Sequence, residues 1–196
     1  MTLMKDWTAL NLISAPTTEP VSRTELKAHL RIDATDEDTY LDGLLLVARK
    51  RAENVTARAF VTQTWRTKYD CFPEAFVLPR PKLQSVTSIQ YLDGAGTTQT
   101  LSADAYQVDA DGEPGRIIPA YGQAWPSTRS GALNAATVTF VAGYGGNATD
   151  VPDELRHAIK LLAAHWYENR EALGQVGSAL PFAVDSLLGM HSMRGF

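Results

Sequence analysis

Apolar residues recur at intervals of three and four over two long stretches, which predicts two amphipathic α-helices. The first stretch covers residues 36–59 and the second covers residues 152–173. Pro152, Asp153 and Glu154 suit the start of a helix, because proline fits the first turn and carboxylates favour its positive end. We expect the helices to pack through Leu41, Leu44, Leu45, Ala48, Ala52 and Val55 on the first and Leu155, Ile159, Leu162 and Trp166 on the second, with Arg49, Lys50, Glu53 and Arg58 on the opposite face of the first.

Capping signals add two shorter helices. Ser22 and Glu25 have the spacing of a capping box, which predicts a helix over 22–31. Thr35 or Asp36 is expected to cap the following long helix, and Pro181 favours a short C-terminal helix that includes Leu187 and Leu188. Residues 1–21 are expected to be extended, because prolines interrupt any helix there.

The segment between the long helices has the composition of short strands. Residues 86–92 form a good strand candidate, and the turn residues 93–96 favour a hairpin with residues 97–101. Further short strands are predicted near 60–70, 75–78, 106–108, 116–118 and 135–142. The predicted fold class is α+β. A discontinuous helical domain (1–60 and 146–196) carries an inserted small antiparallel β domain or barrel (61–145).

The composition is typical of a globular protein and does not indicate a particular activity. Of 196 residues, 44% are hydrophobic, the formal net charge is −4, and one cysteine excludes an internal disulfide. No apolar run approaches the roughly 20 residues of a membrane span. The acidic balance gives no indication of a protein that grips DNA phosphates.

The candidate chemical motifs are each explained more simply by structure. His157 and His165 lack metalloprotease spacing, and the turn at Asp109 lacks the carboxylate that would complete a calcium loop. Structural roles are likewise expected for the glycine-rich residues 143–146, for Cys71 and for the acidic residues 36–38. We therefore predict no catalytic, cofactor or metal site from these motifs.

The order of several short segments resembles the head–tail connector (adaptor) proteins of long-tailed phages and gene transfer agents. The resemblance extends over about residues 22–190, and it rests on order and spacing rather than on one motif. The segments are 25–33 (ELKAHLRID), 52–60 (AENVTARAF), 63–65 (QTW), 78–81 (LPRP), 85–91 (SVTSIQY), 140–145 (FVAGYG), 151–155 (VPDEL), 167–171 (YENRE) and 181–188 (PFAVDSLL).

The resemblance implies a structural role without enzymatic activity or a cofactor. Such adaptors form a ring, typically dodecameric, beneath the portal of a phage-like particle. The ring extends the DNA channel, through which DNA passes without specific binding. It also joins the capsid to a stopper or another tail-completion protein. The implied location is the particle neck, with synthesis in the bacterial cytoplasm.

In such adaptors the C-terminal segment commonly reaches toward the portal, and many family tails end in a more basic run than this one. Here residues 180–196 are the candidate partner-docking tail, through Leu180, Phe182, Leu187, Leu188, Met190, Met193, Arg194 and Phe196. The alternative for the tail is that it folds back on its own helical bundle.

Two other functions stay open. The chain could be a different head- or tail-completion protein of similar size. It could also be a ligand-binding domain whose groove is lined by the aromatic residues of the β segment, namely Trp65, Tyr91, Tyr106, Tyr121 and Trp125. Exposed rings in one concave patch would favour that function, and buried rings would reject it.

Overall fold

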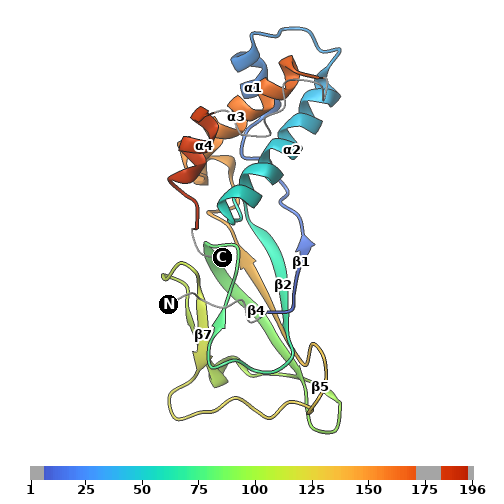
Figure 1. Cartoon of the computed structure of the whole chain (residues 1–196), viewed down its shortest axis with the longest axis vertical. Coiled ribbons are helices and arrows are strands. Elements are labelled where there is room, and N and C mark those ends of the chain that lie inside the picture. The colour runs from blue at the N-terminus through green and yellow to red at the C-terminus, as the bar shows by residue number, and fades with distance from the viewer. Residues whose placement is uncertain (1–6, 171–181, 194–196) are drawn as a thin grey trace. The chain divides into compact units, whose positions relative to one another are not determined.

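The computed structural model describes residues 7–170 and 182–193, and these form two compact units (Figure 1). The helical unit contains residues 17–61, 145–170 and 182–193. The β unit contains residues 7–16 and 62–144. Mixed helices and antiparallel sheets confirm the predicted α+β class. Within the described residues, no helix combines the length and the apolar character needed to cross a bilayer.

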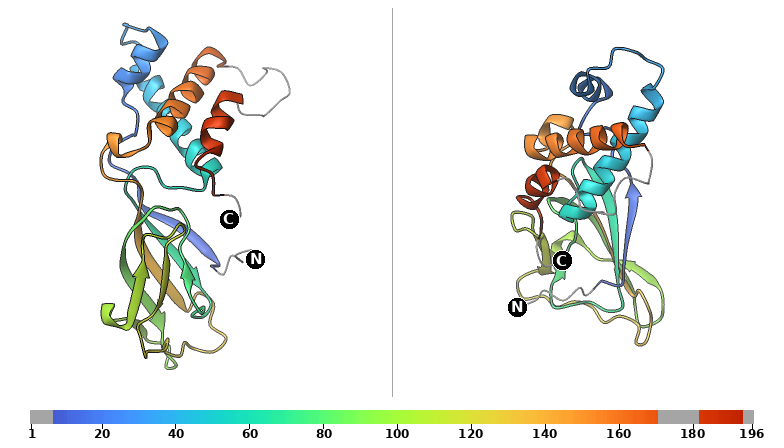
Figure 2. Two further views of the ribbon diagram at one scale, coloured as in Figure 1. Left: turned by 90° about the vertical axis from the view of Figure 1, so that its left-hand side faces the viewer. Right: turned by 45° about the horizontal axis from the view of Figure 1, so that its top comes forward.

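The helical unit is built around α3 (Asp153–Glu168), which follows the short 3₁₀ turn η2 (Ala148–Asp150). The helices α1 (Arg23–Leu30), α2 (Asp38–Thr56) and α4 (Phe182–Gly189) all pack against α3 (Figures 1 and 2). Seven of the ten residues expected to pack the long helices are almost fully buried: Leu41, Leu45, Ala48, Ala52, Leu155, Ile159 and Leu162. Leu44, Val55 and Trp166 are half-buried at the edges of this contact.

The capping box of α1 is present as predicted. The Glu25 amide donates to Ser22 Oγ at 3.2 Å, and the Ser22 amide donates to Glu25 Oε2 at 2.8 Å. Arg156 of α3 forms an ion pair with the same carboxylate, so the cap also ties α1 to α3. Burial raises the pKa of Glu25, but the hydrogen bonds from Ser22 and the charge of Arg156 outweigh it and leave this pKa below its ordinary value.

The prediction for the long helix was wrong at its first turn and on its polar face. The N-cap of α2 is Glu37 and makes no side-chain cap bond, so neither Thr35 nor Asp36 caps the helix. The helix ends at Thr56 because Ala57 adopts the left-handed conformation at φ 56°. Arg49, Glu53 and Arg58, which were expected on the exposed face, are buried, and Leu46 and Val47 are exposed instead.

The buried charges of α2 are neutralised by one connected set of hydrogen bonds. Arg49 donates to Glu53 Oε2 at 2.7 Å and to Glu19 Oε2 at 2.7 Å. The second oxygen of Glu53 accepts the backbone amide of Phe60 at 3.0 Å. Glu53 therefore joins the last turn of α2 to the chain that leaves it, and burial is tolerated because both oxygens have donors.

The β unit contains a five-stranded antiparallel sheet in the order β1-β2-β8-β4-β5. Its strands are β1 (Ala9–Ser14), β2 (Gln63–Tyr69), β4 (Leu83–Leu92), β5 (Thr98–Thr100) and β8 (Ala136–Ala142). A second antiparallel sheet, in the order β3-β7-β6, consists of β3 (Phe76–Val77), β6 (Tyr106–Asp109) and β7 (Arg116–Pro119), and η1 (Ala103–Ala105) precedes β6. The predicted hairpin is confirmed, since Tyr91 of β4 pairs with Gln99 of β5.

One face of the large sheet forms the core of the β unit. In β8 the alternating residues Ala136, Val138 and Phe140 are buried, as the period of a strand requires. The small sheet adds Phe76 and Ile117 to the buried set. A Cβ atom on Gly115 would lie 2.6 Å from the Leu83 side chain, so only glycine allows this approach between the two sheets.

The N-terminal segment departs from the predicted division of the chain. Residues 1–60 were assigned to the helical domain, whereas β1 pairs with β2 along the edge of the large sheet, with Leu10 opposite Thr67. Its side chains give only a weak strand signal, because Leu10 is half-buried whereas Leu12 and Ile13 are exposed, so backbone pairing with β2 places this segment in the sheet.

We predict that Glu53→Ala lowers the free energy of unfolding by about 3–5 kcal/mol, because it leaves Arg49 buried beside a single carboxylate and the Phe60 amide without its acceptor. Urea denaturation followed by circular dichroism measures this change. The matched control is Lys50→Ala on the exposed face of the same helix, which should stay within about 0.5 kcal/mol. Equal effects of the two substitutions would contradict this account.

The Glu25 carboxylate should make the helical unit sensitive to acid. A pKa that is lower in the folded protein stabilises it at pH values above the ordinary Glu value of 4.5, and this stability is lost as the pH falls through the folded-state pKa. Urea unfolding from pH 6 to pH 3 should therefore show a steeper loss in the wild type than in Glu25→Gln. Parallel curves would show that the cap carries no such linkage.

Candidate interaction surfaces

Asp109 and His157, for which structural roles were expected, take part in a turn and in side-chain packing. Asp109 accepts the Gly112 amide at 2.9 Å and pairs with Arg116 at 2.7 Å, which makes it part of a turn and a hairpin. His157 packs edge-on against His29 with ring centroids 6.2 Å apart. Within residues 7–170 and 182–193, no group of three or more His, Cys, Asp or Glu side chains is arranged to hold a metal ion.

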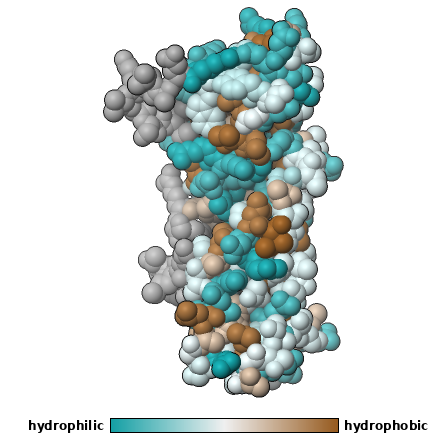
Figure 3. All heavy atoms as spheres, turned by 90° about the vertical axis from the view of Figure 1, so that its right-hand side faces the viewer, coloured by the Kyte–Doolittle hydropathy of each residue, from teal (hydrophilic) through white to brown (hydrophobic). Residues whose placement is uncertain are grey.

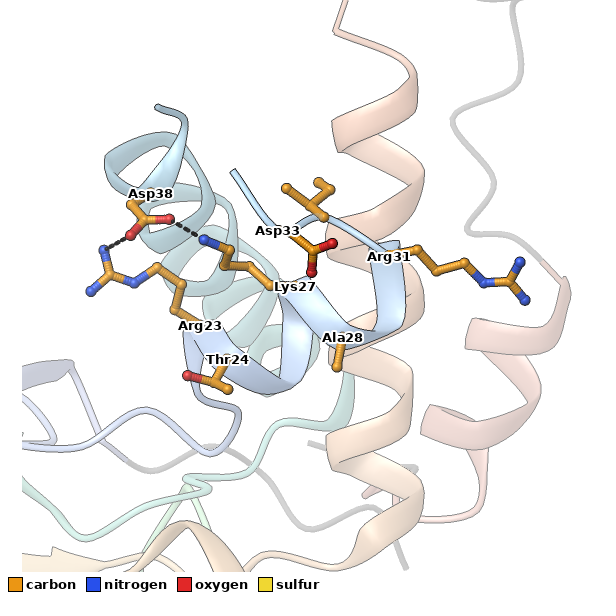
Figure 4. A pocket seen from close by; sticks show the side chains of 8 residues that line it. Arg23, Thr24, Lys27, Ala28, Arg31, Asp33 and Asp38 are labelled. Atoms are coloured by element: carbon orange, nitrogen blue, oxygen red, sulfur yellow. Dashed lines mark hydrogen bonds and ion pairs between the residues drawn. The ribbon is translucent and has the colours of Figure 1, made fainter. Parts of the chain in front are cut away.

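A hollow of about 610 Å³ lies between α1 and the chain that leads into α2 (Figure 4). Lys27 donates to Asp38 at 2.9 Å and Arg23 pairs with it at 3.1 Å, whereas Arg31 points away from both (Figure 4). The Lys27 hydrogen bond holds the pKa of Asp38 below its usual range. With its carboxylate engaged by two cations, Asp38 is positioned to fix the α1–α2 connection rather than to act as a base.

Four of the five rings proposed for a ligand groove are half-buried, and the fifth is exposed. Trp125 stacks on Phe72 with centroids 5.0 Å apart, and Phe72 in turn contacts Tyr91 and Phe76. Trp65 lies beneath the guanidinium of Arg80 at 5.2 Å. Tyr106 is half-buried, and Tyr121 is 98% exposed. The five rings therefore form no exposed aromatic patch, and they are not uniformly buried either.

The C-terminal residues separate into a buried and an exposed set. Val184 and Leu188 of α4 are buried in the helical unit, where α4 packs on α3 and α2. Phe182 is 89% exposed and Met190 is 63% exposed, whereas Leu187 and Met193 are half-buried. Leu188 is therefore placed to hold α4 in the helical unit rather than to contact a partner. Leu180, Arg194 and Phe196 lie outside the described residues.

Residues 191–193 are fastened to the C-terminal end of α2. The Met193 amide donates to the Thr56 carbonyl at 3.2 Å, and Arg58 Nε donates to the His191 carbonyl at 2.6 Å. Arg58 also approaches Met193 Sδ at 3.3 Å. We call residues 191–193 the C-terminal strap. Sequence reasoning missed it because carbonyl and amide partners leave no pattern in side-chain types.

An exposed apolar stretch on α2 was also missed. Leu46 and Val47 are 39% and 52% exposed, in the middle of a helix whose other leucines are mostly covered. Both belong to the apolar run 44–48, of which only Leu44, Leu45 and Ala48 were assigned to the buried face, and their own exposure was not predicted. The available signal was the pair Leu46-Val47 itself, since a 3.6-residue period cannot bury every residue of such a run.

Comparison with known proteins identifies the group of folds to which this chain is similar. A family model for phage gp6-like head–tail connector proteins matches residues 130–189, a span that includes β8, α3 and α4. No curated protein matches the chain.

Three solved structures match almost the whole chain. A chain in the neck of an empty gene transfer agent particle, computed with C6 symmetry, has a TM-score of 0.78 and 26% identity, and the match covers 94% of this chain and 95% of that one. A chain in the virion of a native gene transfer agent particle has a TM-score of 0.76 and 25% identity, with 93% and 94% covered. A chain in the neck of the native particle, computed with C12 symmetry, has a TM-score of 0.73 and 25% identity, with 94% and 95% covered. The resemblance and the fold expected from the sequence are thereby confirmed.

We predict that Trp125→Ala lowers the free energy of unfolding by about 2–3 kcal/mol, since a partly buried ring and its stacking contact are lost. Tyr121→Ala is the matched control and should change it by less than about 0.5 kcal/mol. Urea unfolding measures both. A stable Trp125 variant would reopen the possibility that this ring serves a binding site.

Proposed function

We propose that the chain is a structural head–tail adaptor, a ring subunit in the neck of a phage-like or gene transfer agent particle, with no enzymatic role. The observation that carries the proposal is the match over 94% of the chain, at a TM-score of 0.78, to a chain of a particle neck. The connector family match over residues 130–189 points to the same role independently.

The symmetry of the similar structures supports a ring of identical subunits. One neck was computed with C12 symmetry and another with C6 symmetry, and twelve copies satisfy both. A closed ring needs two different surface patches on each subunit, and each patch meets the other on a neighbouring copy. We therefore propose a dodecamer as the assembled state.

The proposed channel function agrees with the charge of the subunit. The formal net charge is −4, and such an acidic balance does not favour a tight hold on DNA phosphates through counterion release. DNA would pass through such a ring without specific binding.

We further propose that the C-terminal end contacts the portal and that another surface contacts a stopper or tail-completion protein. The burial of Leu188 restricts the portal contact to the part of the tail that the helical unit leaves accessible. Because the C-terminal strap fixes residues 191–193 beside α2, the residues that follow it, Arg194 to Phe196, are the best candidates.

The alternative is that the chain is a different component of the neck, such as a stopper. A stopper would share the particle neck but would lie on the tail side of the adaptor ring. Placement of the chain relative to the portal separates these two functions.

Removal of this chain from a producing cell should give heads that do not join tails. Electron microscopy of such particles should show separate, untailed heads, and complementation with the wild-type chain should restore attachment. Normally tailed particles from cells without the chain would contradict the proposal.

We predict that truncation after Met193 reduces portal binding at least tenfold, equivalent to about 1.4 kcal/mol or more. This truncation leaves every contact of the C-terminal strap in place, so the free energy of unfolding should stay within about 0.5 kcal/mol of the full chain. Binding is measured by co-purification with tagged portal protein at graded concentrations. Undiminished binding would exclude residues 194–196 as the portal contact.

A further inference from the structure

The α2 helix presents a continuous exposed stripe, here called the α2 stripe, which consists of Tyr40, Gly43, Leu46, Val47, Lys50 and Arg51. Single exposed apolar residues need no explanation, but adjacent ones on a helix face are typical of an interaction site. Lys50 and Arg51 follow Leu46 and Val47 at the C-terminal end of the stripe. Neither of these two cationic side chains has an ion-pair or hydrogen-bond partner among the described residues.

A second exposed stripe lies on α4. It consists of Phe182, Ala183, Asp185, Ser186 and Met190 and is called the α4 stripe here. Phe182 and Met190 are the two most exposed large apolar side chains of the described helical unit. Asp185 is exposed between them and, within residues 7–170 and 182–193, has no ion-pair or hydrogen-bond partner. Aromatic residues and methionine are enriched in protein interfaces, so the composition suits a buried contact.

The two stripes lie on different helices and consist of residues left exposed by the packing of the helical unit. Both α2 and α4 pack on α3, and they also contact each other (Figures 1 and 2). The residues that bury the two helices, such as Leu45 and Leu188, belong to neither stripe. Figure 3 looks at the side that bears α2 and shows apolar side chains in patches among polar ones on the helical unit. A subunit that exposes two different surface patches meets the requirement for a head-to-tail ring contact.

We propose that the α2 stripe of one subunit packs against the α4 stripe of the next copy of this chain, which forms the ring contact. The inference rests on the proposed ring and assigns the two surfaces that close it. Leu46 and Val47 would be covered by Phe182 and Met190, and Lys50 or Arg51 would pair with Asp185. The opposite charges fix which stripe meets which, since complementary charge sets partner choice and register.

Self-pairing of either stripe is disfavoured by the same charges. Two α2 stripes would offer no carboxylate to Lys50 and Arg51, and two α4 stripes would offer no cation to Asp185. Such contacts are also isologous and end at a dimer, whereas contact between unlike stripes continues from subunit to subunit.

Cysteine cross-linking in assembled particles tests the contact directly. In a Cys71→Ser background, which removes the one native thiol, Val47→Cys and Ser186→Cys place a thiol on each stripe. Particles carrying both cysteines, treated with a short bifunctional maleimide, should give a ladder of covalent dimers, trimers and higher multimers on a denaturing gel. Each single-cysteine variant is the control and should stay monomeric.

Two results would overturn the assignment. Absence of a ladder from doubly substituted particles that contain the chain in their necks would show that other surfaces form the ring. Dimers from a single-cysteine variant would show that a stripe meets its own copy. Either result would leave the adaptor function intact, whereas particles whose necks lack the chain altogether would refute the proposed function instead.

Charge reversal gives an independent measurement. Asp185→Lys and Lys50→Glu should each reduce incorporation into particles at least fivefold in competition with the wild-type chain, and the double variant should recover to within about twofold. Glu168→Lys, an equal charge change at an exposed residue outside both stripes, should incorporate normally. Circular dichroism confirms that each variant folds. A double variant no better than the weaker single one would contradict a pairing of these two residues.

Discussion

The buried pair of Arg49 and Glu53 is the interaction on which the rest of the helical unit depends. Glu53 accepts Arg49 with one oxygen and the Phe60 amide with the other, so it fixes the turn that follows α2. That turn carries Arg58, which binds the carbonyl of His191 and approaches the sulfur of Met193. One carboxylate in α2 is therefore linked, through the turn and Arg58, to residues 191–193, more than 130 residues later.

This arrangement decides which surfaces are available for assembly. Because Val184 and Leu188 hold α4 against the helical unit, the opposite side of α4 is left exposed with Phe182 and Met190. On α2, Leu46 and Val47 are exposed, because the buried positions of this helix are occupied by leucines, alanines and the ion pair of Arg49 and Glu53. The helical unit thus presents two unlike surfaces, which is the property that a ring-forming subunit needs.

Much of the fold could be predicted from local patterns. The Ser22–Glu25 box, the hairpin at residues 93–96 and the apolar periods of α2 and α3 all depend on residues close together in the sequence. The pairing of β1 with β2 could not be predicted, because the paired residues lie 50 to 59 positions apart in the sequence and the strand signal of β1 is short. Arg49 and Glu53 were misplaced because residue type predicts exposure for an isolated charge, whereas each of these charges is compensated by the other.

The candidate surfaces could be predicted only in part. The sequence indicated that the apolar residues of the tail would be buried against some surface. It did not show that Leu188 is buried within the helical unit whereas Phe182 stays exposed. This division depends on the orientation of a two-turn helix on α3, which eight residues do not specify. Leu46 and Val47 were left out of the predicted buried face of α2, but residue type alone did not show that both stay exposed.

Cryo-electron microscopy of the neck of the particle that contains this chain tests the central claim most directly. The account predicts a ring of twelve copies adjoining the portal, with α2 of each subunit in contact with α4 of the next. A map that places the chain away from the portal vertex, or as an isolated copy without ring neighbours, would contradict it.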